Sequence, residues 1–200
     1  MNDGSLYKWW VVTPTRTGST LLVNIVHGFF DPDKPVWMGG LNTPKKLMKI
    51  LKSHDTRLFH QEKYTKTPYD LKENCVKIIS VERPEIQKIL KYSADGVDIV
   101  PPDEFSKVKK LDHVLVLDYT NDLLYKSDYS PYAEKNLIDI IKNIAEKIEL
   151  KFKISISEYQ IQNAINRVIK MNEKYENIKN SDFEYCDKFY HIHGGHRNRK

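Results

Sequence analysis

The chain has 200 residues, of which 40% are hydrophobic and 30% charged, and its net charge is +5 at pH 7. This composition is typical of a globular protein with one substantial core, so we treat residues 1–200 as a single domain. The mild positive charge suits an anionic ligand, but it is too weak and too scattered for a protein that binds nucleic acid. No stretch has the length of an apolar membrane span, and the chain does not open on a basic and then apolar leader. The sequence therefore predicts a cytoplasmic protein with no membrane insertion.

The first predicted elements are a strand and a helix joined by a tight turn. Trp9–Val12 is a short apolar run of strand type, and Leu21–Phe29 carries apolar residues at helical spacing. A strand that enters a helix through such a turn brings backbone N–H groups and the positive end of the helix dipole to one point, which predicts an anion site. One arginine, one glycine and three hydroxyl residues would contact the anion: Arg16, Thr17, Gly18, Ser19 and Thr20.

The stretch Arg16-Thr17-Gly18-Ser19-Thr20 resembles the 5′-phosphosulfate loop of the sulfotransferases, which reads Pro-Lys/Arg-Ser/Thr-Gly-Ser/Thr-Thr/Ser after the first strand. An ATP-binding P-loop needs a longer loop with more widely spaced glycines and a Gly-Lys-Ser/Thr ending, and this stretch has neither. The resemblance implies that the loop binds the 5′ end of 3′-phosphoadenosine-5′-phosphosulfate (PAPS), the sulfate donor of that family.

The rest of the chain is predicted to alternate strands and helices. In chain order we expect a helix from Pro44 through Leu51, strands over Thr56–Tyr64 and from Val76 to Arg83, a helix over Glu85–Tyr92, a turn-rich connection over Asp95–Pro102, and a strand over His113–Tyr119. Two amphipathic helices follow, one through Leu137–Ile148 and one that starts at a capping box of Ser155 and Glu158. This alternation predicts a three-layer α/β/α domain with a mainly parallel central sheet. The resemblance implies the P-loop-like sulfotransferase form of that fold.

The predicted strand before Pro84 ends in Arg83, and an arginine at that place is well positioned for a second phosphate. The stretch Asn74–Pro84 resembles the sulfotransferase strand whose closing arginine binds the 3′-phosphate of the nucleotide. In that family a serine one to two helical turns later shares the phosphate, and Ser93 is the nearest candidate, slightly later than usual. A surface ion pair of Arg83 with a neighbouring glutamate is the alternative interpretation.

The preceding strand is the place to seek a general base, because sulfuryl transfer to a hydroxyl needs a group that takes the proton of the attacking oxygen. Arg57–Glu62 can be laid over the family's Arg-Leu-Ile-Lys-Thr-His, which puts Glu62 at the position of the base. His60 lies on the same face of the predicted strand and is the competing candidate. An ordinary glutamate is a weak base, so Glu62 would need partial burial to act. A solvated carboxylate and a polar strand-edge histidine are the alternative interpretations.

The late strand over His113–Tyr119, with the Leu123-Leu124 that follows, resembles the family strand that ends in Tyr-Glu-Asp-Leu-Leu. The acidic pair of that motif is replaced here by Thr120-Asn121-Asp122. Only the tyrosine and the leucines carry over, so this segment predicts a structural match and no catalytic residue.

The C-terminal segment offers a second basic loop. Sulfotransferases carry a loop with glycine and arginine or lysine near the C-terminus, where it closes over the 3′-phosphate. Gly194, Gly195 and Arg197 resemble that loop in composition, although not in residue order. A disordered basic tail is the alternative interpretation.

Neither the cysteines nor the histidines predict a metal centre. Cys75 and Cys186 are far apart and neither has metal-ligand spacing around it, so we expect free thiols in a reducing compartment, with a single disulfide as the alternative. The His-x-His-x-x-His pattern at 191–196 is similar to that of metallo-β-lactamases, but Gly195 replaces the aspartate of that pattern and the further ligands do not follow. A structural zinc at these histidines is the alternative interpretation.

Together the resemblances imply a sulfotransferase that moves the sulfuryl group of PAPS in line to a hydroxyl or amine of an acceptor, with no metal required. Arg16 and the Thr17–Thr20 groups would stabilise charge on the leaving oxygen. The sequence does not identify the acceptor, whether small molecule, glycan or peptide. Two alternatives stay open: a non-catalytic protein that binds the phosphonucleotide, and a P-loop enzyme like the nucleotide or nucleoside kinases.

Overall fold

The computed structural model describes residues 4, 7–14, 17–39, 49–54, 58–59, 76–84, 102–124, 135–176 and 187–192 of the chain. Four strands form one sheet in the order β2-β1-β3-β4, and every neighbouring pair is parallel. The strands are β1 (Lys8–Val12), β2 (Ile50–Ser53), β3 (Val76–Glu82) and β4 (Val114–Asp118). The prediction of an α/β domain with a parallel sheet is confirmed.

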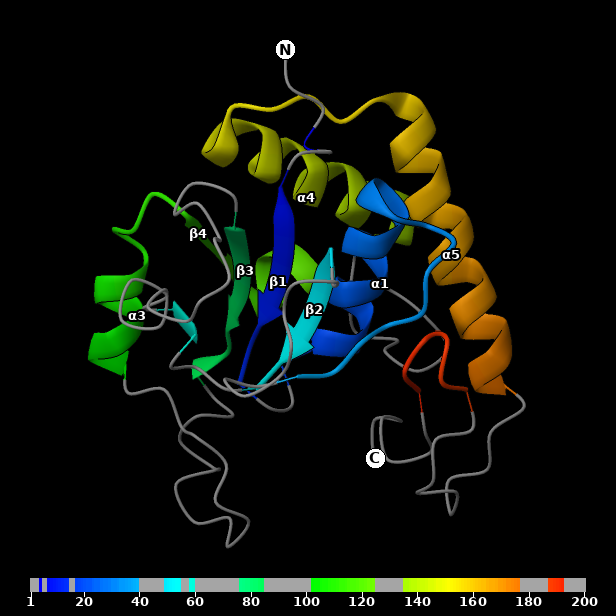
Figure 1. Cartoon of the computed structure of the whole chain (residues 1–200), viewed down its shortest axis with the longest axis horizontal. Coiled ribbons are helices and arrows are strands. Elements are labelled where there is room, and N and C mark those ends of the chain that lie inside the picture. Colours follow the sequence, from blue (N-terminus) through cyan, green and yellow to red (C-terminus); the bar gives the residue numbers. More distant parts are fainter. Residues whose placement is uncertain are drawn as a thin grey trace, which may run out of the picture.

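The helices of the described ranges lie on both sides of this sheet, with α3 on one side of the strands and α1 and α5 on the other (Figure 1). Their bounds are α1 (Ser19–Phe30), α3 (Pro102–Val108), α4 (Leu137–Phe152) and α5 (Glu158–Glu176), with one π-helical turn, η5 (Tyr119–Leu123), directly after β4. None of the helices in these ranges is both long and apolar enough to cross a membrane.

Strand β1 is apolar at almost every position because both of its faces are covered. Trp9 and Val11 point into the core that contains the apolar faces of α1, α4 and α5. Trp10 and Val12, which alternate with them, point into a second core on the side of α3. A run of consecutive buried residues is the pattern expected of a central strand in a parallel sheet with helices on both faces.

Helices α1 and α5 pack at very short range, and one glycine makes this possible. A Cβ atom added to Gly28 would lie 2.2 Å from the Cα and 2.7 Å from the backbone nitrogen of Ala164 on α5. No side chain can occupy that space, so Gly28 sets the distance between the two helices. Gln160 at the start of α5 adds a hydrogen bond from its Nε2 to the carbonyl of Phe29, 2.9 Å away.

The position of the strands predicts where a ligand should bind. The chain runs from β1 outward to β2 and then crosses back to β3 on the other side of β1. In parallel α/β sheets ligands bind outside the carboxyl ends of the strands at the point where the order reverses, here between β1 and β3. The residues that follow these two strands, from Thr13 on one and Arg83 on the other, border that point.

Two predicted elements are wrong in the residues described. The helix expected from Pro44 through Leu51 does not reach its end, because Ile50 and Leu51 lie in β2 and pair with Trp9 and Trp10. Short apolar runs do not distinguish helix from strand, and here pairing with β1 decides. The strand expected over Thr56–Tyr64 is also wrong at Leu58 and Phe59, which form a 3₁₀ turn with fully buried side chains.

The start of the last helix also differs from the prediction. The capping box is formed by Ser157 and Gln160, not by Ser155 and Glu158: the amide of Gln160 donates to Ser157 Oγ at 3.3 Å, and the amide of Ser157 donates to Gln160 Oε1 at 2.9 Å. Both pairs have the spacing of a capping box, but α5 begins at Glu158, so Ser157 is the residue that precedes its first turn. Helix α3 was not expected, since the sequence predicted turns up to Pro102. The predicted helix over residues 85–92 lies outside the described residues.

We predict that Gly28→Ala lowers the free energy of unfolding by about 1–3 kcal/mol, the usual cost of overpacking a core. The loss should appear even though alanine favours helix over glycine by about 1 kcal/mol. Urea unfolding followed by circular dichroism measures it. As a control, Lys142→Ala on the exposed face of α4 should stay within about 0.5 kcal/mol of the parent. Equal stability of Gly28→Ala and the parent would contradict the close contact with Ala164.

Candidate functional site

The described end of the turn between β1 and α1 has a backbone conformation that suits an anion site. Gly18 precedes the helix with φ 75° and ψ 19°, a left-handed conformation that residues with a side chain rarely adopt. Its carbonyl accepts the first bond of the helix, from the amide of Leu22 at 3.0 Å. The amides of the first turn thus have no acceptor within the helix, and that turn contains no acidic side chain. The buried Thr17 braces the turn by donating its hydroxyl to the carbonyl of Pro14 at 2.7 Å.

A buried lysine reaches the first turn of α1 from the neighbouring strand. Lys52 of β2 is 1% exposed, and its Nζ donates to Thr20 Oγ1 at 2.8 Å. Its backbone is held at the edge of the sheet, where its amide bonds to the carbonyl of Trp37 and its carbonyl accepts from Gly39. Burial lowers the pKa of Lys52 to about 7, so the amine changes its charge near neutral pH. A cation with this property beside a helix N-terminus suits a site that receives an anion.

A histidine lies next to this lysine at the carboxyl end of β2. The ring Nδ1 of His54 lies 2.8 Å from the carbonyl oxygen of Thr13. A carbonyl only accepts, so Nδ1 carries the proton and Nε2 is left with a lone pair. Burial lowers the pKa of His54, the bond to Thr13 opposes this shift, and the charge of Lys52 adds to it. The imidazole is therefore neutral at pH 7 and able to accept a proton.

The two anion-binding segments predicted from the sequence meet at one aromatic ring. The guanidinium carbon of Arg83 lies 3.9 Å from the centre of the Tyr119 ring, in a cation–π stack. The edge of the same ring borders the β1–α1 turn, since a Cβ atom added to Gly18 would lie 3.2 Å from Tyr119 Cε2. Tyr119 therefore connects the carboxyl ends of β1 and β3.

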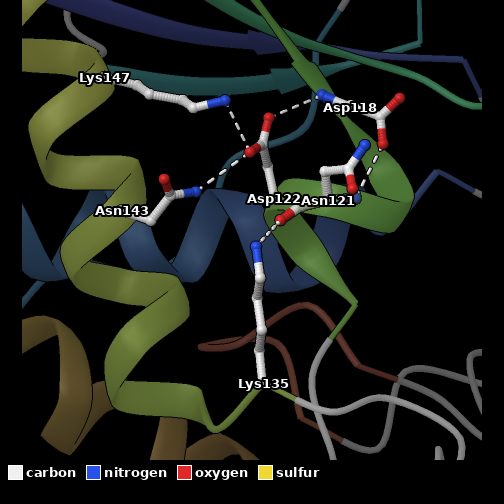
Figure 2. Close-up of polar contacts among 6 residues, drawn as sticks. All are labelled: Asp118, Asn121, Asp122, Lys135, Asn143 and Lys147. Atoms are coloured by element: carbon white, nitrogen blue, oxygen red, sulfur yellow. Dashed lines mark hydrogen bonds and ion pairs between the residues drawn. The ribbon is translucent and has the colours of Figure 1, made fainter.

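The η5 turn that carries Tyr119 is anchored by a buried carboxylate (Figure 2). Asp122, 2% exposed, accepts hydrogen bonds from Lys147 Nζ at 2.7 Å, Asn143 Nδ2 at 3.1 Å and the amide of Asp118 at 2.9 Å. Two of these donors come from α4. The turn is thus attached to the helix layer behind the sheet.

A buried polar path runs from the site to α5. The amide of Asn24, on α1, donates to the carbonyl of Thr20 at 2.8 Å and to that of Tyr190 at 2.9 Å, and its oxygen accepts from Arg167 Nε at 3.0 Å. Arg167 also donates to the carbonyls of Pro32 and Phe189. Burial lowers the pKa of Arg167 to about 10, which leaves it charged at neutral pH. These bonds attach the first turn of α1 to α5 and to the segment that contains Phe189 and Tyr190.

The structure brings together part of the predicted site. Thr17 and Gly18 directly precede α1, and Ser19 and Thr20 are its first two residues. Arg83 lies against the face of the Tyr119 ring, whose edge borders Gly18. The other predicted site residues lie outside the described residues: Arg16, His60, Glu62, Ser93, Gly194, Gly195 and Arg197. Their roles stay predictions. Cys75 and Cys186 lie outside them as well, so the expectation of free thiols is likewise untested.

The residues that sequence reasoning missed are Lys52, His54, Tyr119 as a contact, and Asp122. A signal for the first two was present, since a lysine and a histidine two positions apart follow the apolar Ile50-Leu51. It was lost because that pair was assigned to a helix. No local pattern marks Tyr119 or Asp122, whose partners lie on other elements.

The comparisons assign no family to this arrangement: no family model matches the chain, and a search of curated proteins returns no significant match. Among the described residues, no three histidine, cysteine or acidic side chains are grouped so that they could hold a metal ion.

We predict that Lys52 makes stability depend on pH. Its pKa is about 7 in the folded chain and near 10.5 when unfolded. Between these values the unfolded chain holds a proton that the folded chain lacks, so stability rises with pH. Below pH ~7 both states are protonated and the full cost of the buried charge applies. Lys52→Met, which removes the charge, should therefore gain stability relative to the parent most at pH 6 and least at pH 9.

Urea unfolding of parent and variant at pH 6, 7.5 and 9 tests this. Leu51→Met, a neighbouring buried substitution without a titrating group, is the control and should shift stability equally at all three values. A difference between Lys52→Met and the parent that does not change with pH would show that Lys52 keeps its ordinary pKa.

Proposed function

We propose that the protein is a sulfotransferase, which binds PAPS and moves its sulfuryl group to a hydroxyl or amine of an acceptor. The observation that carries the proposal is the meeting of two predicted anion sites at Tyr119, with Gly18 of the β1–α1 turn at the ring edge and Arg83 over the ring face. A nucleotide with anionic groups at both its 5′ and 3′ positions needs two such sites close together.

The residues around the β1–α1 turn fit the 5′ end of this donor. Thr13 is fully buried after β1, and within the described part of the chain its hydroxyl has no hydrogen-bond partner. Ser19 and Thr20 add hydroxyls in the first turn of α1, where the backbone amides point toward an anion. Lys52 and, from the sequence, Arg16 supply positive charge. When bound, PAPS supplies the sulfuryl group and a phosphate leaving group.

The strand register supports a base other than the residues predicted from the sequence. The strand beside β1 is β2, which ends with Lys52-Ser53-His54. This stretch, with Ile50-Leu51 before it, is similar to the family's Leu-Ile-Lys-Thr-His, the same motif that the sequence analysis aligned with residues 58–62. We therefore place His54 in the role first given to Glu62 or His60.

The environment of His54 and Lys52 suits sulfuryl transfer. His54 is held through Nδ1 by the carbonyl of Thr13, so its Nε2 would take the proton from the attacking hydroxyl. Lys52, bonded to Thr20 at the start of α1, would gain a proton as the anion binds, because a nearby negative charge raises the pKa of an amine. The resulting ammonium would stabilise the charge that grows on the leaving phosphate oxygen.

The first test is nucleotide preference. We expect adenosine 3′,5′-bisphosphate to stabilise the protein more than ADP or ATP with magnesium in a thermal-shift assay, because it carries a phosphate for each of the two anion sites. A ligand at a hundred times its dissociation constant adds ~2.7 kcal/mol to the free energy of unfolding, which such an assay detects. Arg83→Gln should weaken the bisphosphate about ten- to a hundredfold by calorimetry, the loss of one charge-assisted contact. A preference for ATP with magnesium would instead favour the kinase-like alternative. Bisphosphate binding without transfer to any acceptor would favour the non-catalytic one.

The second test assigns the base. His54→Asn should keep the affinity for adenosine 3′,5′-bisphosphate and lower turnover by about 10²–10⁴, the usual contribution of a general base. Turnover is measured as nucleotide released from PAPS in the presence of phenol, sugar and amine acceptors. Glu62→Gln and His60→Asn are run in the same assay. If either of these abolishes turnover while His54→Asn retains it, the role moves back to that residue.

A further inference from the structure

We infer that Asp122 is a positioning residue, which holds the Tyr119 ring against Arg83 and so orders the arginine for the second anionic group of a ligand. Asp122 lies three residues after Tyr119 in η5. Within the described ranges, its hydrogen bonds go to Asp118, Asn143 and Lys147, and none goes to the β1–α1 turn or to Arg83. It acts through the ring. The ligand part of the inference rests on the proposed function, whereas the contact between ring and arginine does not.

Asp122 is built into the structure as an anchor. Its carboxylate is almost fully buried and receives three hydrogen bonds, from the amide of Asp118 at one oxygen and from Asn143 and Lys147 of α4 at the other (Figure 2). Burial by itself would raise the pKa of Asp122, but the bonds from Lys147, Asp118 and Asn143 outweigh it and lower the pKa. The carboxylate is therefore ionised at neutral pH, the form that accepts all three bonds.

The anchor fixes the turn that carries the ring. Tyr119 is the first residue of η5, and its carbonyl accepts from the amide of Leu124 at 2.9 Å, which closes a wide π-helical turn. The turn is held at its start by Asp118 Oδ1, which accepts from the amide of Asn121 at 2.8 Å. From outside, Lys135 Nζ donates to the carbonyl of Asn121 at 2.6 Å, as Figure 2 shows. With both ends and the middle of the turn attached, the Cα of Tyr119 has little freedom to move.

The ring of Tyr119 then connects the two anion sites. Its Cδ2 and Cε2 edge borders Gly18, and its face carries the guanidinium of Arg83 at 3.9 Å. An arginine side chain alone has many rotamers, and ordering it costs free energy at the moment of binding. An arginine already stacked on a fixed ring has lost much of that freedom. A substitution at Asp122 that loosens the turn should therefore lower the affinity for the anionic group that Arg83 binds, although it removes no group that touches the ligand.

The first experiment needs no ligand. The Nε–Hε signal of Arg83, assigned by its loss in Arg83→Lys, should be displaced by the ring current of Tyr119 in the NMR spectrum of the parent. Tyr119→Leu gives the position of the unstacked arginine. In Asp122→Asn we expect the signal to move most of the way to that position. Lys147→Met is the milder second variant, because it leaves Asn143 and the amide of Asp118 bonded to Asp122, and should move the signal in the same direction.

The second experiment measures ligand preference by calorimetry, as the ratio of the dissociation constants of adenosine 5′-monophosphate and adenosine 3′,5′-bisphosphate. We expect Asp122→Asn and Tyr119→Leu each to reduce the parent's preference for the bisphosphate about tenfold, the lower end of the loss expected from Arg83→Gln, because the arginine itself is kept. The matched control is Asn136→Ala, which removes the N-cap of α4, the helix that also carries Asn143 and Lys147. It should lower the melting temperature and leave the preference unchanged.

The outcomes separate the two proposals. An Arg83 signal that stays at the parent position in Asp122→Asn and Lys147→Met, while Tyr119→Leu moves it, overturns the positioning role of Asp122. A loss of preference in Asn136→Ala equal to that in Asp122→Asn also overturns it, because general destabilisation would then explain the effect. A parent that binds both nucleotides alike overturns the proposed function, and the Arg83 signal still decides the positioning role.

Discussion

The side chain of Asn24 is the point on which the arrangement around the candidate site depends. Fully buried in α1, it bonds to the carbonyls of Thr20 and Tyr190 and accepts from Arg167. A buried amide is stable only where its donors and acceptor are satisfied together. Asn24 therefore fixes the relative positions of three segments: the first turn of α1, the segment that contains Tyr190 and the middle of α5. The first turn of α1, where the anion site is predicted, is thus held in place by α5 and by the segment that contains Tyr190.

Burial also sets the electrostatics of the site. Lys52 and His54 both have pKa values lowered by burial, so the site holds groups whose charge responds to what binds. Without an anion, a charged Lys52 costs stability. An anion at the start of α1 would offset part of that cost, because its negative charge favours the protonated amine. Under the proposed function, the free protein would lose some stability and bind a negatively charged ligand more strongly.

Tyr119 links two segments that lie far apart in the sequence. The β1–α1 turn and the end of β3 are separated by about sixty residues of chain. Parallel pairing brings their ends to one edge of the sheet, but it does not set how Arg83 is oriented. The η5 turn does this by placing the ring between them, and α4 holds the turn through Asp122. The contact between Arg83 and the strand edge near Gly18 thus depends in part on the helix layer.

The sequence by itself determined β1, α1, β3, β4, α4 and α5, because each has a local signal: an apolar run, a helical period or a glycine that permits a left-handed turn. It also predicted Gly18 and Arg83 as site residues, because each follows a strand that is apolar enough to recognise. Only the tertiary structure decided β2, because Ile50-Leu51 is too short to show a period and becomes a strand by pairing with β1. The positions of Lys52 and His54 depend on β2 and were therefore also decided by the tertiary structure. Tyr119 and Asp122 were likewise decided by the fold, because their roles rest on partners far away in the chain, which no local pattern specifies.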